Sequence, residues 1–214
     1  MLSTRSAIAF VFVFAIGCSS SDPAPLPEVT PDAGKSSKDA STLNDDDDDG
    51  GDLRFGPGTK LDGNLSWEGF VDGSDTASTI RLSDFHDPDG SKGIHALLLT
   101  QESLTCAFSY DAAEEIQKRA PAWSKDGIEV LQLVVYDDKD EPATVEVARK
   151  WKDHFEATWN VAADPEFTFH EIGHNPLPIQ IVVDPRTLTV VARANANDHR
   201  MLTKLEDLAE QNRP

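Results

Sequence analysis

The sequence predicts an α/β fold in three layers, with a central mixed β-sheet flanked by helices. Two compact apolar runs, Ile94–Thr100 and Ile128–Tyr136, are typical of strands that are buried on both faces. A helical pattern follows each run, and two more strands and a last helix come after them. Because strands alternate with helices in this order, we expect helices on both faces of the sheet.

Three helices are expected from the spacing of apolar side chains. The first covers Ala107–Ala120, where alanine and isoleucine recur at helical spacing and Pro121 limits the end. The second begins near Pro142 and runs to about Trp159, with an apolar face of valine, alanine and aromatic residues. The third covers Asp198–Gln211, with methionine and leucine side chains on one face.

Short strands are expected at both ends of the folded part. Leu65–Val71 and Ser78–Leu82 have strand character and are separated by a turn signal, Asp72-Gly73. Pro178–Val183 and Leu188–Arg193 are separated by a short polar turn. This spacing favours a β-hairpin near the end of the chain.

The composition is strongly acidic, with a formal net charge of −19. This balance argues against nucleic acid as a partner, because proteins that bind phosphates need an excess of lysine and arginine. It also disfavours direct attraction to anionic membrane surfaces. Residues 19–54 contribute ten acidic and three basic side chains, a net −7, and the folded part is acidic in its own right.

The first 17 residues have the pattern of a signal peptide, with Arg5 followed by an apolar run too short to cross a bilayer. The sequence Ala15-Ile16-Gly17-Cys18 resembles a bacterial lipobox. This resemblance implies cleavage before Cys18, attachment of lipid to its sulfur, and a place in the cell envelope, with the domain in the periplasm or outside the cell. The alternative is an ordinary secretory signal in which the cysteine is incidental.

The chain is expected to have three parts: a signal peptide (1–17), a lipidated cysteine with a linker (18–54), and one folded domain (55–214). The linker is rich in serine, aspartate, proline and glycine and contains no aromatic residue. Such a segment cannot bury enough apolar surface to offset the entropy lost on ordering. We therefore expect a solvated, self-repelling acidic spacer, whose only link to a membrane is the lipid.

Cys106 stands at the junction of the first buried strand and the first helix. With this element order, the region resembles the thioredoxin-like redoxin family of thiol–disulfide oxidoreductases and peroxiredoxins. Leu177-Pro178 falls where that family has its cis-proline, and Ser109 falls where it has its second cysteine, so the motif is a degenerate Cys-x-x-Ser. The peroxidase pattern of the family is only half met, by Ser103 and Cys106.

A cysteine at the start of a helix faces unpaired backbone N–H groups and the positive end of the helix dipole, which favour the reactive thiolate. Ser109 lies one turn further on and is a candidate hydrogen-bond donor to that thiolate, but it cannot form a disulfide. A single cysteine would form a mixed disulfide that an external thiol must resolve. The resemblance implies that Pro178 guides the substrate strand toward the sulfur.

The partners implied are a protein thiol or disulfide and an external reductant, and no metal or organic cofactor is implied. Another interpretation of Cys106 stays open. It could be an inert core residue, since free cysteines are often buried, in which case the domain would be a binding module with a thioredoxin-like fold and no redox activity.

A second motif, His170-Glu171-Ile172-Gly173-His174, matches the H-E-x-x-H pattern of zinc proteases. That chemistry needs a helix, so that both imidazoles share one face, and a third protein ligand. Pro165 and Pro176 flank the motif and oppose a helix, and the remaining histidines show no ligand-like spacing. We therefore rank a zinc site at His170, Glu171 and His174 below the redox interpretation.

Overall fold

The computed structural model describes residues 54–170, 176–195 and 198–214. Within these ranges the elements in chain order are β1 (Ser66–Phe70), β2 (Ser78–Arg81), the 3-10 helix η1 (Leu82–Phe85), β3 (Ala96–Ser103), α1 (Ala107–Trp123), the 3-10 helix η2 (Ser124–Asp126), β4 (Ile128–Tyr136), α2 (Val145–His154), β5 (Asn160–Ala163), β6 (Ile179–Asp184), β7 (Thr189–Asn195) and α3 (His199–Asn212).

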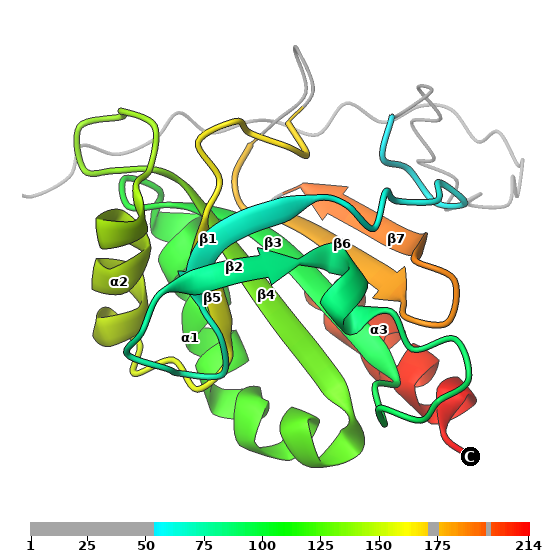
Figure 1. The fold of residues 1–214 in the computed structure, drawn as a ribbon. Coiled ribbons are helices and arrows are strands. Elements are labelled where there is room, and N and C mark those ends of the chain that lie inside the picture. Colours follow the sequence, from blue (N-terminus) through cyan, green and yellow to red (C-terminus); the bar gives the residue numbers. More distant parts are fainter. Residues whose placement is uncertain (1–53, 171–175, 196–197) are drawn as a thin grey trace, which may run out of the picture. The chain divides into compact units, whose positions relative to one another are not determined.

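The strands form one mixed sheet with the order β2-β1-β5-β4-β3-β6-β7 (Figure 1). Strands β3, β4 and β5 are parallel, whereas β1 joins β5, and β6 joins β3, in antiparallel pairs. The expected α/β class with a mixed sheet is confirmed, as is the β6–β7 hairpin. Among the described helices, none is long and apolar enough to cross a membrane.

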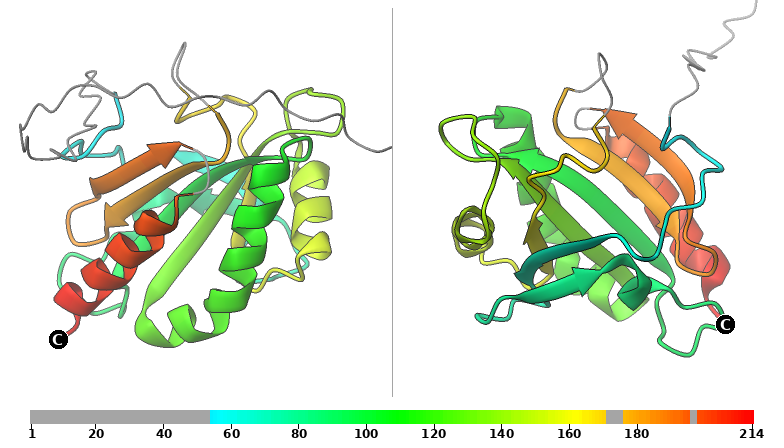
Figure 2. Two further views of the ribbon diagram at one scale, coloured as in Figure 1. Left: turned by 180° about the vertical axis from the view of Figure 1, so that it is seen from behind. Right: turned by 45° about the horizontal axis from the view of Figure 1, so that its top comes forward.

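All three α-helices cover the same face of the sheet, as the left view of Figure 2 shows. Ala96 and Leu98 of β3 point into the core beneath them, whereas Leu97 and Leu99 point to the opposite face. The two crossovers β3–α1–β4 and β4–α2–β5 step across the sheet in the same direction. Because such crossovers are right-handed, they place α1 and α2 on one side.

The opposite face carries a second apolar cluster that holds the 3-10 helix η1 and no described α-helix. Phe169 lies in this cluster and packs against Phe55 and Trp67, with ring centroids 5.1 and 6.1 Å apart. The expectation of helices on both faces is thus met only by the single turn of η1. The segment between β5 and β6 contains Pro165 and Pro176, which oppose a regular helix, and residues 164–170 form turns.

The ends of β3 and α1 both differ from the prediction. Strand β3 continues to Ser103, beyond the expected end at Thr100. Helix α1 passes through Pro121 and ends at Trp123, because a proline in the last turn removes only one backbone hydrogen bond and the Trp123 side chain is buried. Gly127, with φ +70°, then ends the turn of η2 that leads into β4.

The second helix is shorter than expected, and the strand that follows it was not predicted. Helix α2 covers only Val145–His154, and β5 occupies Asn160–Ala163. This strand has four residues and two are alanine, which favours helix as much as strand. Its pairing with β1 and β4 determines its conformation, and periodicity within the segment could not reveal that pairing.

Candidate functional site

Cys106 is the N-cap residue of α1 and follows directly on the end of β3. Its carbonyl accepts the N–H groups of Ser109 and Tyr110, at 3.0 and 3.4 Å, so the helix begins on this residue. The side chain is partly exposed. The sulfur therefore lies at the positive end of a 17-residue helix, where developing negative charge is stabilised.

The thiol of Cys106 faces the start of β6. Its Sγ donates a hydrogen bond to the Leu177 carbonyl, with a separation of 3.2 Å. The next peptide bond, Leu177–Pro178, is cis, and Pro178 is buried. Two residues that are far apart in the sequence are thus brought together, because the end of β3 lies beside the start of β6.

Ser109 is fully buried on the inner side of α1. Its hydroxyl accepts the backbone N–H of Ser103 at 3.2 Å, and its own N–H donates to the Cys106 carbonyl. No hydrogen bond joins this hydroxyl to the Cys106 sulfur among the described residues. Ser109 thus fixes the first turn of α1 onto the end of β3.

Glu102 is a buried carboxyl group at this end of β3 that was not assigned a role from the sequence. Its side chain is 0% exposed, and burial raises its pKa to about 8. The polar neighbours Thr100, Ser109 and Gln132 oppose the shift without cancelling it. Neither carboxyl oxygen has a hydrogen bond of good geometry in the described part of the chain.

Gln132 is the polar residue of β4 beside this carboxyl group. Its Oε1 accepts the indole N–H groups of Trp151 and Trp159, at 3.2 and 2.7 Å. These two bonds fix the Gln132 side chain, and its polar end acts to lower the pKa of Glu102. A buried polar row, consisting of Thr100, Glu102, Gln132 and Ser109, thus lies beneath the helix that begins at Cys106.

A sequence signal for this row exists in the four polar residues that end β3. The sequence predicts that this strand ends at Thr100, and polar side chains beyond a strand end need no explanation. Because the strand continues to Ser103, these residues are buried instead. A run of polar residues directly after a buried apolar strand and before a helix-capping cysteine could have pointed to an internal polar site.

The outer rim of the site has both polar and apolar parts. Thr105 donates its hydroxyl to Asp140 at 2.8 Å and lies 2.9 Å from the Ser103 hydroxyl, which links the loop after β4 to the residue before the cysteine. On the other side, Phe108 is 60% exposed in the first turn of α1. An exposed aromatic ring therefore lies two residues beyond the cysteine in the chain.

The zinc motif falls mostly outside the described residues. His170 is exposed and its N–H donates to the Phe167 carbonyl in a turn. Glu171 and His174 lie outside the described residues, as does Cys18 of the lipobox. Within the ranges that the structure describes, no group of three or more histidine, cysteine, aspartate or glutamate side chains could hold a metal ion.

A scan of protein-family models finds no match to this chain, and a search of curated proteins finds no relative. Solved structures do share its fold. An uncharacterized conserved protein from Geobacillus kaustophilus superposes with a TM-score of 0.54 at 16% identity, covering 75% of this chain and 86% of the other.

Two further solved structures share the fold. Peroxidoxin BcpB from Mycobacterium tuberculosis has a TM-score of 0.52 at 11% identity and covers 75% of this chain and 99% of its own. The reduced 2-Cys peroxiredoxin of Plasmodium vivax has a TM-score of 0.52 at 13% identity, with coverages of 72% and 82%. The domain thus has the thioredoxin-like α/β fold. At these identities the similarity is one of fold, and function must be argued from the site.

Proposed function

We propose that the domain is a thiol–disulfide oxidoreductase that works through one cysteine, Cys106. The observation that carries this proposal is the position of the sulfur: at the N-cap of α1 and 3.2 Å from the carbonyl that precedes a cis-proline. The helix start favours the thiolate, and the partial exposure of the side chain leaves room for a second sulfur to approach.

The reaction is an exchange between the Cys106 thiolate and a substrate disulfide. The thiolate attacks one sulfur, the substrate S–S bond breaks, and the second substrate sulfur leaves as a thiolate that takes up a proton. Cys106 is now joined to the substrate in a mixed disulfide. An external thiol then attacks the substrate sulfur of this bond, Cys106 leaves as a thiolate that takes up a proton, and the external thiol is joined to the substrate in a new mixed disulfide. A second external thiol attacks that bond, releases the reduced substrate and forms an oxidised external disulfide, so the two electrons come from the two external thiols.

Pro178 and Leu177 serve the substrate in this proposal. Because proline has no N–H, the start of β6 offers a carbonyl without a competing donor. In the free protein the Leu177 oxygen accepts a hydrogen bond from the Cys106 thiol. Once the thiol has reacted, this oxygen is available to a backbone N–H of the substrate. Pro178 thus acts as a positioning residue.

Ser109 and Glu102 form the buried polar layer beneath the site. Because burial raises the pKa of Glu102 to about 8, this carboxyl group is mostly protonated at neutral pH and adds little negative charge at the end of β3. Ser109 links Cys106 and Glu102, because it bonds the Cys106 carbonyl and lies beside the carboxyl group. As the pH rises past 8, Glu102 becomes negatively charged, and this charge opposes negative charge at the start of α1.

The N-terminal part adds a location to this function. We propose that residues 1–17 are removed, that Cys18 carries lipid, and that residues 18–54 form an acidic spacer between membrane and domain. The substrate would then be a thiol or disulfide protein of the cell envelope. Mass spectrometry of the membrane-extracted protein tests this part, because it should detect acyl groups on an N-terminal Cys18.

The redox proposal is tested by trapping the mixed disulfide. The full chain with Cys18→Ser has Cys106 as its only thiol. Exposed to a neutral aromatic disulfide, the folded protein should gain one adduct by intact mass and lose it on addition of an external thiol. The Cys18→Ser/Cys106→Ser protein should gain none. If Cys106 reacts only after unfolding, the domain is a binding module without redox activity.

A further inference from the structure

A cavity of about 570 Å³ lies beside β1 and the start of α2, outside the Cys106 site. We call it the Trp67 pocket, and its apolar wall consists of Trp67, Pro142, Ala143, Val145, Ala163 and Pro165. The volume is in the range of pockets that hold a large side chain or a small molecule. Nothing in the reaction proposed for Cys106 uses it.

The strands that lead to the pocket and to Cys106 end at the same edge of the sheet. Asp164 in its lining directly follows β5, and Cys106 follows β3, and both of these strands run parallel to β4. Because neighbouring strands lie about 4.8 Å apart, the pocket is roughly 10–15 Å from the sulfur. A polypeptide whose cysteine reaches Cys106 could therefore also reach the pocket with a residue about three to five positions away.

The polar part of the lining is acidic. Glu68, Asp164 and Glu166 line the pocket, and no lysine, arginine or histidine is among its described lining residues. Asp164 is buried and held in place by bonds from Gln101 Nε2 at 2.6 Å and the Thr168 hydroxyl at 2.8 Å. Glu68 and Glu166 are exposed, and neither has an ion pair in the described ranges.

This charge excludes two classes of occupant. An anionic ligand would meet three carboxylates with no basic group to offset them. The chain's own linker, residues 19–54, carries a net −7 and would be repelled in the same way. A cationic group on an apolar stem fits both features, because its methylene groups can lie on the Trp67 wall while its charged end reaches the carboxylates.

We infer that the Trp67 pocket binds an arginine or lysine side chain of the protein substrate, a few residues from the cysteine that reacts with Cys106. The pocket then selects basic segments, while the sulfur performs the exchange. This inference rests on the proposed function for its biological meaning, but binding at the pocket can be measured without any redox chemistry.

The test uses short peptides in which serine replaces the reacting cysteine and arginine, glutamine or glutamate lies about four residues away. The full chain is labelled with ¹⁵N, and the indole N–H signal of Trp67, assigned with Trp67→Phe, is followed during titration at low salt. We expect the arginine peptide to shift this signal and the glutamate peptide to leave it unchanged. The double variant Glu68→Gln/Glu166→Gln should weaken binding about five- to tenfold.

A charge-matched control is the double variant Glu114→Gln/Asp207→Asn, which removes two exposed carboxylates that do not line the pocket. It should bind the arginine peptide as the unchanged chain does. Equal affinity for the arginine and glutamate peptides would overturn the inference, and so would a control that weakens binding as much as the pocket variant.

The reaction of Cys106 separates this inference from the proposed function. With cysteine versions of the peptides as activated disulfides, the arginine peptide should react faster than the glutamate peptide, and the pocket variant should remove that preference. Reaction with all peptides at one rate disproves the pocket while it supports the redox function. Binding of the arginine peptide without reaction at Cys106 supports the pocket and disproves the redox function.

Discussion

The two ends of the sheet bury carboxyl groups in opposite ways. Asp87, at the end away from Cys106, accepts the N–H groups of Lys92 and Ile94 at 3.1 and 3.0 Å and pairs with Arg186 at 3.3 Å. Burial acts to raise the pKa of Asp87, but these donors overcome it and hold the pKa below its ordinary value. Glu102 has no basic partner and keeps a raised pKa.

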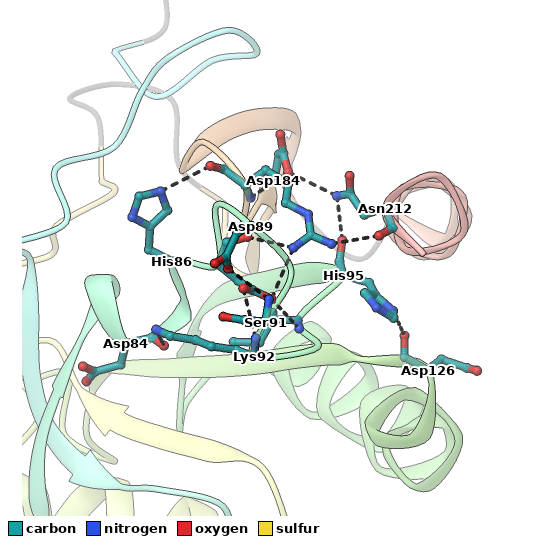
Figure 3. A network of polar contacts seen from close by, with 12 residues as sticks. Asp84, His86, Asp89, Ser91, Lys92, His95, Asp126, Asp184 and Asn212 are labelled. Atoms are coloured by element: carbon teal, nitrogen blue, oxygen red, sulfur yellow. Dashed lines mark hydrogen bonds and ion pairs between the residues drawn. The ribbon is translucent and has the colours of Figure 1, made fainter. Parts of the chain in front are cut away.

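The contacts around Asp87 tie three segments together. Arg186 in the β6–β7 turn donates to the Asp87 carbonyl and to the Asn212 carbonyl, both at 2.8 Å. Asn212, at the end of α3, donates to the His95 carbonyl and to Asp184 (Figure 3). Every one of these groups has a partner. We call this network, formed by Asp87, Arg186 and Asn212 with their partners, the clasp, because it holds three segments together. At the Cys106 end the burial of Glu102 is uncompensated, which is typical of a functional site.

The largest expected effect is the loss of stability caused by Glu102 as the pH rises. The folded pKa of about 8 lies above the value of 4.5 expected in the unfolded chain, so folding takes up a proton between these values. The stability contribution is present below pH 4.5 and is lost as the pH rises through 8, by an amount on the order of 3–5 kcal/mol. Urea unfolding should show this slope in the unchanged chain and a much smaller slope in Glu102→Gln, where the partly buried Glu129, whose pKa burial also raises, still contributes. The same slope in both proteins would contradict the role of Glu102.

The clasp should respond to mutation rather than to alkaline pH. Arg186→Ala leaves Asp87 buried with no cation, and we expect a loss of about 2–3 kcal/mol. The value is below that of a deeply buried pair because the Arg186 side chain is 21% exposed. Arg200→Ala is the control, since Arg200 is 87% exposed in its pair with Asp198 and should change stability by less than about 0.5 kcal/mol. Equal losses in the two variants would show that the Arg186 contacts are not structural.

The same comparison predicts a kinetic effect at Cys106. Above pH 8 the ionised Glu102 opposes the thiolate in the unchanged chain, and Glu102→Gln removes this charge. Alkylation of Cys106 by a neutral reagent should therefore be severalfold faster in the variant at high pH and similar in both proteins well below pH 8. A constant rate ratio across the pH range would separate Glu102 from the thiol.

The smallest expected effect concerns the exposed ring two residues after the cysteine. Phe108 is 60% exposed, so Phe108→Ala should change the free energy of unfolding by no more than about 0.5 kcal/mol. Exchange with a small disulfide should be unchanged, while exchange with a peptide disulfide should slow, because only the peptide can contact the ring. A slower reaction with both substrates would place Phe108 in the chemical step instead.

Much of the fold could be predicted from the sequence, because its long elements have strong periodicity. Strand β4 and helix α3 are found within one residue of their expected ends. Strand β5 could not be predicted, since its conformation depends on partners far away in the chain. The side of the sheet on which α2 lies also depends on the strand that follows it, and missing β5 obscured this.

The candidate site was predictable in part. The position of Cys106 at a helix start and its link to Leu177 and Pro178 follow from the element order and the resemblance to redoxins. Glu102 was missed, because its burial depends on the extension of β3. The Trp67 pocket joins β1, the start of α2 and the turn after β5, and no local pattern shows that these segments meet.

The central claim is that the fold makes Cys106 a reactive thiol. The most direct measurement compares its rate of exchange with a neutral aromatic disulfide in the folded Cys18→Ser chain and in the same chain unfolded in urea at one pH. The proposed function requires the folded protein to react faster, because the start of α1 stabilises the attacking thiolate. A folded protein that reacts more slowly than the unfolded chain would contradict it.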